Sequence, residues 1–219
     1  MITFADVKND PQIRTYIKKA DEVLGSLGYT EHSFAHVTRV AAEAKLILAA
    51  RGYGEHDQEL AQIAGYIHDI GNIVNRVDHA QSGAIMAFRI LDRMGMEPED
   101  IAVIVSAIGN HDEGTAYPVN HIAAALILAD KTDVRRTRVR PKETVDRDIH
   151  DRVNYAVEKA RTTLEDDGDS LLLNLTIDTS ICPVMDYFEI FLGRMLLCRK
   201  AADKLGMRFR LTINGQELL

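Results

Sequence analysis

A histidine and an aspartate stand side by side inside an apolar stretch, YIHDIGN at residues 66–72. An imidazole or a carboxylate in a protein core is costly unless it is paired or bound to a metal ion. Because neighbouring helical residues point about 100° apart, His68 and Asp69 can meet one ligand only at a helix end. Gly71 suits such an end, since glycine tolerates the left-handed backbone that often closes a helix. Imidazole and carboxylate both bind transition metals; a polar helix cap is the alternative for this pair taken alone.

Helical periodicity runs through the first part of the chain. Apolar residues recur three or four positions apart, and short polar loops separate the segments, at residues 10–27, 34–51, 57–70, 80–91, 98–110 and 122–130. Helices joined by such short loops are typical of an all-α bundle. The sequence therefore predicts a mainly α fold.

The pattern changes after residue 130. Four arginines fall within residues 135–140, and the remaining patterns predict a helix, a strand, a long helix and a second strand, at residues 149–164, 171–177, 183–205 and 209–213. We expect a helical domain over residues 1–145. Residues 146–219 are expected to form a helix and a small β-α-β appendage packed on that domain.

The composition is that of an ordinary globular protein, with 219 residues, 46% of them hydrophobic and 27% charged. The net charge of −7 argues against a nonspecific nucleic-acid binder. The sequence contains neither an apolar run long enough for a membrane span nor the pattern of a signal peptide. Cys182 and Cys198 lie far apart and indicate reduced thiols, so we expect a cytoplasmic protein.

Six potential metal ligands lie at the beginnings or ends of predicted helices, each beside an apolar stripe: His36, His68, Asp69, His79, His111 and Asp130. Side chains from several helices can converge at such ends, and bundle interiors are known places for two-metal sites. Four other histidines have polar neighbours or outward-facing positions and are predicted to lie at the surface: His32, His56, His121 and His150.

The order of these ligands resembles that of the HD-domain superfamily of metal-dependent phosphohydrolases, whose signature is a histidine, a His-Asp pair and a distant aspartate. The matching sequence segments are HVTRV from His36, HDIG from His68 and LADK ending at Lys131. The resemblance covers residues 30–140 and implies an HD-type helical bundle. Nothing beyond Arg140 contributes to it.

The additional histidines resemble the branch of that superfamily that holds two metals. The resemblance implies a first ion bound by His36, His68, Asp69 and Asp130. Asp69 would bridge to a second ion held by His79 and His111. Iron, manganese, zinc and cobalt all suit these ligands.

The segment HDEGTAYP at residues 111–118 is similar to the HD-GYP variant, a family of cyclic di-GMP phosphodiesterases. Three positions depart from that variant. Asn72 replaces a phosphate-contacting lysine, Asp112 replaces a second histidine, and Ala116 replaces the glycine before Tyr-Pro. These departures argue against cyclic di-GMP as the substrate and against a third metal.

The expected reaction is hydrolysis of a phosphate ester or anhydride, with a nucleotide as the expected small-molecule substrate and a metal-bridging hydroxide as the nucleophile. Asp69, His111 and Asp112 are the predicted catalytic residues, with Asp112 or the adjacent Glu113 as the proton donor to the leaving group. Phosphate oxygens would be bound by Lys131, Arg135 and Arg136, which follow Asp130. The alternative for this basic segment is a solvated loop or a subunit contact.

Two other functions fit the same ligands. A diiron oxygenase of HD type would use O₂ to cleave a C–C or C–P bond, although the arginines after Asp130 favour phosphate. A catalytically silent HD module would bind a nucleotide as a sensor, although all six ligand positions are filled. The long helix over residues 183–205 is suited either to a homodimer interface or to the core.

Overall fold

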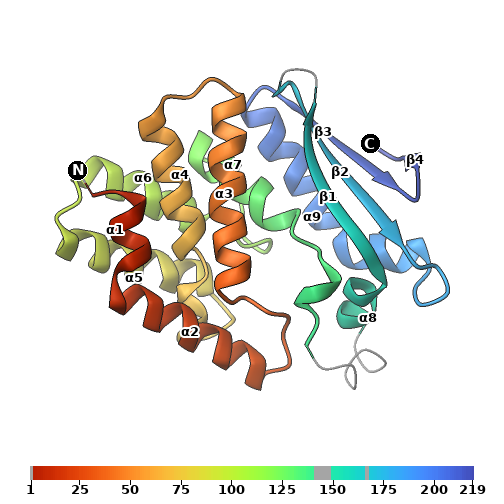
Figure 1. The fold of residues 1–219 in the computed structure, drawn as a ribbon, viewed down its shortest axis with the longest axis horizontal. Coiled ribbons are helices and arrows are strands. Elements are labelled where there is room, and N and C mark those ends of the chain that lie inside the picture. The colour runs from red at the N-terminus through yellow and green to blue at the C-terminus, as the bar shows by residue number, and fades with distance from the viewer. Residues whose placement is uncertain (1, 141–148, 166–167) are drawn as a thin grey trace.

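A computed structural model describes residues 2–140, 149–165 and 168–219 (Figure 1). Its helical part comprises α1 to α8 and two 3-10 turns: α1 (Phe4–Asn9), α2 (Pro11–Ser26), α3 (Phe34–Ala50), α4 (Glu55–Ile67), η1 (Ile70–Ile73), α5 (His79–Met94), α6 (Pro98–Gly109), α7 (His121–Lys131), η2 (Arg136–Arg138) and α8 (Ile149–Ala156). The remainder comprises β1 (Val157–Glu165), β2 (Ser170–Ile177), α9 (Val184–Lys204), β3 (Arg208–Ile213) and β4 (Gln216–Glu217). The predicted mainly α fold is confirmed.

Local sequence signals account for several helix starts. The side chain of Asp10 accepts hydrogen bonds from two backbone amides at the start of α2, and Ser33 caps α3 in the same way. Pro98 occupies the first turn of α6, where a missing N–H costs nothing. Helix α1 was not predicted, because its six residues are too few to show a period; Thr3 and Asp6 form a capping box that starts it.

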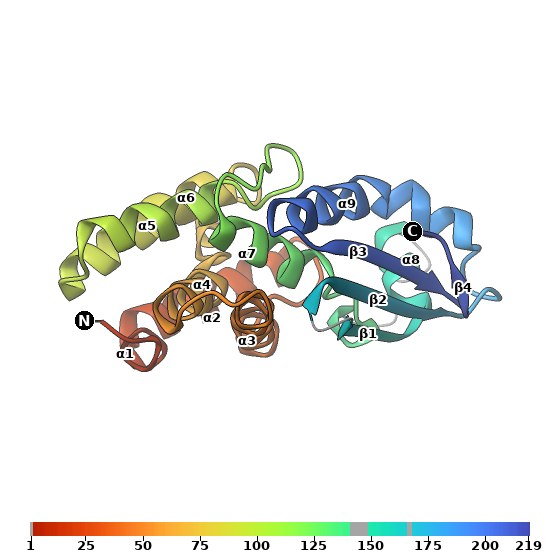
Figure 2. The ribbon, with the colours of Figure 1, turned by 90° about the horizontal axis from the view of Figure 1, so that it is seen from above.

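Helix α7 is the central helix of the bundle. Every residue from Ile122 to Lys131 is buried, including Asp130. Helices α3, α4 and α6 pack against it on one side, and α9 packs on another (Figures 1 and 2). The end of α7 therefore delivers polar side chains into the interior of the molecule.

The C-terminal strands form one sheet in the order β1-β2-β3-β4. Strands β2 and β3 are parallel and are connected through α9, as predicted for a β-α-β unit. Asn214 and Gly215 both have left-handed backbones, with φ of 52° and 81°, and make the tight turn into β4. Helix α9 lies along the sheet and faces α7, so it links the sheet to the bundle (Figure 2).

The helix predicted for residues 149–164 is wrong in its second half. The helix ends at Ala156, and residues Val157–Glu165 form β1, which pairs antiparallel with β2. Ala160 and Leu164 fit a helical period, but Thr162 and Thr163, which lie between them, are β-branched and favour a strand. The edge of β2 also needs a hydrogen-bonding partner, which β1 supplies. The predicted domain boundary at 145/146 falls outside the described residues.

No helix within the described part of the chain is both long and apolar enough to cross a membrane.

Candidate metal centre

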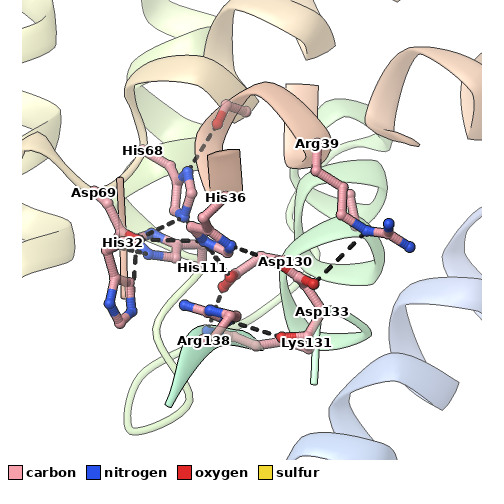
Figure 3. Close-up of polar contacts among 12 residues, drawn as sticks. His32, His36, Arg39, His68, Asp69, His111, Asp130, Lys131, Asp133 and Arg138 are labelled. Atoms are coloured by element: carbon pink, nitrogen blue, oxygen red, sulfur yellow. Dashed lines mark hydrogen bonds and ion pairs between the residues drawn. The ribbon is translucent and has the colours of Figure 1, made fainter. Parts of the chain in front are cut away.

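Six side chains from five segments meet in the interior of the helical bundle. Figure 3 shows His36, His68, Asp69, His111 and Asp130 among them. His36 comes from the first turn of α3, His68 caps the end of α4, and Asp69 follows it. The other three are His79 at the start of α5, His111 just after α6, and Asp130 near the end of α7. All six are buried.

The two carboxylate oxygens of Asp69 lie near different histidines. Oδ2 is 3.0 Å from Nε2 of His68 and 3.6 Å from Nε2 of His36. Oδ1 is 3.5 Å from Nε2 of His79 and 3.8 Å from Nε2 of His111. One carboxylate thus lies between the imidazoles of His36 and His68 and those of His79 and His111.

Asp130 completes the first set. Its Oδ1 is 3.3 Å from Nε2 of His36 and 3.7 Å from Nε2 of His68. The ligand atoms of His36, His68 and Asp130 all lie within 4.8 Å of one another, as do those of His68, Asp69 and His111. The two groups share His68, and either one is compact enough to hold an ion.

Every one of these imidazoles is anchored through Nδ1. Carbonyl oxygens of Gly65, Arg76 and Ile108 lie 2.9, 3.0 and 2.6 Å from Nδ1 of His68, His79 and His111, respectively. These contacts fix the Nδ1–H tautomer and leave Nε2 as the acceptor that points to the centre.

The residues fit a bound cation. Nε2 of His36 and Nε2 of His68 are buried and make no hydrogen bond in the described residues. Burial opposes charge on His68, yet the carboxylates of Asp69 and Asp130 raise its pKa to about 10. Burial likewise opposes charge on Asp69, but His68 and His32 hold its pKa well below the usual range. The centre therefore attracts positive charge, and its nitrogen and oxygen donors suit iron, manganese, zinc or cobalt.

Gly71 serves close packing and does not close a helix in the left-handed conformation, so that prediction is wrong. The backbone φ angle of Gly71 is not positive. A Cβ at Gly71 would lie 2.0 Å from the carbonyl oxygen of His79 and 2.4 Å from the amide nitrogen of Gly83. The absence of a side chain lets the start of α5, with His79, approach the His68-Asp69 segment.

A model of the HD domain matches residues 33–156, more than half of the chain. The chain belongs to the HD-domain family. HD domains are typically metal-dependent hydrolases, and the buried histidines and aspartates agree with divalent metal binding. The chain is also similar to an uncharacterized protein of Methanocaldococcus jannaschii, with 26% identity over 156 residues that cover 61% of this chain and 60% of that protein. The match thus spans less than two thirds of that relative's length.

A cavity of about 460 Å³ opens over this HD centre. Asp69, His79, His111 and Asp130 form its floor. Its walls come from the loop before α3, the loop after α6, and helices α8 and α9. The C-terminal segment therefore supplies part of the wall around the HD-domain residues.

The predicted substrate-binding residues fall in different places. Lys131 lines the cavity, and its Nζ lies 2.7 Å from Oδ2 of Asp130. Arg135 instead pairs with Asp133, with Nη2 2.9 Å from Oδ2. Arg136 donates from Nε to the carbonyl oxygen of Tyr155 and lies over that ring. Neither Arg135 nor Arg136 is among the described residues that line the cavity.

Two polar residues near the predicted ligands also reach the centre. Asp112 lines the cavity, with Oδ1 3.8 Å from Nε2 of His79. The amide of Asn72, at the position of the HD-GYP lysine, donates to Oδ1 of Asp69 at 3.0 Å. Asn72 thereby holds the carboxylate that lies between the two sets of imidazoles.

The prediction that His32 lies at the surface is wrong. Its side chain is 11% exposed, lines the cavity and places Nε2 3.9 Å from Oδ2 of Asp69. Because His32 precedes the cap of α3, no helical period marks it as inward-facing. His56 and His121 are paired with Asp100 and Asp57 outside the cavity, and the side chain of His150 lies outside the described residues.

Sequence reasoning also missed three arginines that line the cavity, namely Arg76, Arg138 and Arg194. Arg76 follows η1, Arg138 ends η2, and Arg194 lies on α9. The cluster of arginines after Asp130 signalled that one of its members could bind anions, but its spacing did not reveal which. Nothing in the sequence linked Arg194 to a centre formed by residues so much earlier in the chain.

Proposed function

We propose that this protein is a two-metal phosphohydrolase that cleaves a phosphate ester or anhydride, with a nucleotide as the substrate class. The position of Asp69 carries this proposal. Its two oxygens lie near two separate sets of imidazoles, one of which also includes Asp130. Two divalent ions bound there would supply Lewis acidity, lowering the pKa of water and stabilising charge on a phosphoryl oxygen.

Phosphate is favoured as the substrate group because cationic side chains surround the cavity above these ligands. Lys131, Arg76, Arg138 and Arg194 all line it. Guanidinium groups match phosphate oxygens in geometry and remain charged at all physiological pH values. A hydrocarbon or neutral substrate would bring no anionic group to these four cations.

The protein's own residues then have separate tasks. The carbonyl oxygens behind His68, His79 and His111 hold the imidazoles in orientation. Lys131 faces the phosphoryl group from its position beside Asp130. Asp112 is the proposed proton donor to the leaving group: it takes up the proton that the attacking water loses as the new P–O bond forms, and it passes that proton to the leaving oxygen as the old P–O bond breaks.

The test combines metal analysis with a substrate panel. Purified protein is stripped of metal, reloaded with Fe, Mn, Zn or Co, and supplied with mono- and dinucleotides, dinucleoside polyphosphates and cyclic nucleotides. Metal-dependent release of phosphate or a nucleoside phosphate is expected, with about two ions bound per chain. Oxygen uptake without phosphate release would instead indicate an oxygenase, and bound metal without turnover would indicate a nucleotide sensor.

A further inference from the structure

Arg138 is a buried cation without an acidic partner in the described part of the chain. It is 7% exposed and lines the cavity. Its guanidinium donates to two backbone carbonyl oxygens, that of Glu31 at 2.9 Å from Nε and that of Asp133 at 2.8 Å from Nη1. Burial lowers the pKa of this guanidinium, and the negative charges of Asp133, Asp130 and Asp69 offset that effect only in part. A buried charge of this kind calls for an anion, and the cavity is where one can enter.

Arg194 reaches the same cavity from the C-terminal segment. It lies on α9, beyond the residues that match the HD domain. Its guanidinium lies over the ring of Phe191, 4.5 Å from the centroid, and its Nε donates to Oε1 of Glu113 at 2.7 Å. The ring and the carboxylate hold the side chain toward the cavity, so little ordering is needed when an anion binds.

Glu113 lies between two cations. Its Oε1 is 2.7 Å from Arg194 and 3.9 Å from Nζ of Lys131. A carboxylate oxygen thus occupies a position between an ammonium and a guanidinium that a phosphate oxygen could also take. Glu113 lies on the loop between α6 and α7 and is one-third exposed, at 34%, so it can give way to a ligand.

The cations fall into two groups by their contacts with the candidate ligands, and Nη1 of Arg76 lies 3.4 Å from Nε2 of His79. Lys131 pairs directly with Asp130, which places it at the phosphoryl group on the metal centre. Arg138 and Arg194 form no ion pair with any of the six candidate ligands in the residues that the structure describes. They are therefore available to anionic oxygens beyond that first phosphoryl group.

We propose that Arg138 and Arg194 form a subsite for a second phosphoryl group, so that the substrate carries a diphosphate or a longer phosphate chain. This rests on the proposed function for the first phosphoryl group. Guanidinium forks bind phosphate oxygens in bidentate fashion, which suits two arginines contributed by separate elements. The cavity of about 460 Å³ lies within the size range of small-molecule sites and leaves room for more than one phosphoryl group.

Binding of non-hydrolysable probes tests the subsite independently of turnover. Calorimetry on metal-free protein would compare methylenediphosphonate, which has two phosphonate groups, with methylphosphonate, which has one. Wild-type protein is expected to bind the diphosphonate at least ~10-fold more tightly. Arg194→Gln and Arg138→Gln should each reduce that preference ~10-fold or more, because each removes a charge-assisted hydrogen bond. Arg199→Gln, an exposed position on the same helix, serves as the control and should retain it.

Arg138→Lys provides a second variant, because it keeps the charge and lacks the fork. An intermediate preference for the diphosphonate is expected, with circular dichroism used to verify the fold. Equal affinity of wild-type protein for both probes, or an unchanged preference in folded Arg194→Gln, would overturn the subsite even if nucleotides are hydrolysed. A preference that depends on the arginines, without hydrolysis of any nucleotide, would support the subsite and reject the proposed function.

Discussion

Oδ2 of Asp133 lies 2.8 Å from Nδ1 of His36, although 97 residues separate them in the chain. Both side chains are fully buried. His36 is the candidate ligand whose Nδ1 is held by a carboxylate, while backbone carbonyl oxygens hold those of His68, His79 and His111. The contact orients Nε2 of His36 toward Asp69 and Asp130. The negative charge of Asp133 also raises the basicity of the imidazole, which makes it a stronger metal ligand.

Asp133→Asn should weaken metal binding about 10–100-fold, because the neutral amide orients and polarises His36 less effectively than the carboxylate. Competition with a chromogenic chelator measures the affinity. Asp203→Asn, an exposed substitution on α9, is the matched control. Equal metal affinity in the Asp133 variant and the control would contradict the orienting role.

Asp69→Ala should abolish turnover and remove metal from both sets of imidazoles, because one carboxylate lies between them. Metal content by elemental analysis and nucleotide hydrolysis are the two measurements. The control is Asp92→Asn, which changes an exposed carboxylate on α5. Retained activity in Asp69→Ala would refute the site.

Removing the metal should lower the melting temperature by about 10 °C, since ions bound only to the folded state add a few kcal/mol to its stability. Helical content should survive, because the hydrophobic core extends well beyond the centre. Thermal unfolding followed by circular dichroism, with and without a chelator, gives both values. A melting temperature insensitive to the chelator and to metal replacement would argue that no ion binds tightly.

Gly71→Ala should destabilise the protein by about 3 kcal/mol or more, because the new Cβ would clash with backbone atoms of α5. Gly193→Ala provides the opposite case. A Cβ there would point into open space, and alanine in a helix is favoured over glycine by roughly 0.5–1 kcal/mol. Urea unfolding of the two variants should therefore shift in opposite directions, and shifts in the same direction would contradict this packing.

Alkaline stability should depend on Cys198. Burial raises the pKa of this thiol from 9.0 to about 12. Between these values the native state keeps the proton and the unfolded state loses it, so the free energy of unfolding falls with rising pH by about 1.4 kcal/mol per pH unit. Cys198→Ala should remove that part of the slope. Denaturant titrations between pH 9 and 10 would show it, and an unchanged slope would contradict the buried thiol's contribution.

The elements that were predicted have strong local signals. Helices α2, α3 and α6 combine an apolar period with a capping residue or a proline, and β2 and β3 alternate clearly. The convergence of the six candidate ligands was predictable because each adjoins an apolar stripe at a helix end. Burial of a helix face determines where its terminal polar residues must lie.

The elements that were missed depend on contacts between distant segments. Strand β1 follows a helical period and becomes a strand through pairing with β2. His32 lies in a loop whose path is set by its contacts with the rest of the fold, including the bond from Arg138 to the carbonyl oxygen of Glu31. Arg194 belongs to a helix that contacts both the sheet and α7, so no single period identifies its orientation.

Helix α9 packs against α7 (Figure 2), and its Arg194 lines the cavity above the candidate ligands, so the C-terminal segment is part of the same packed structure. A chain cut after residue 140 would expose to water the apolar face of α7 that packs against α9. It would also remove the part of the cavity wall that α8 and α9 supply. Substitutions on α9 can therefore reshape the wall of the cavity while the six candidate ligands stay unchanged.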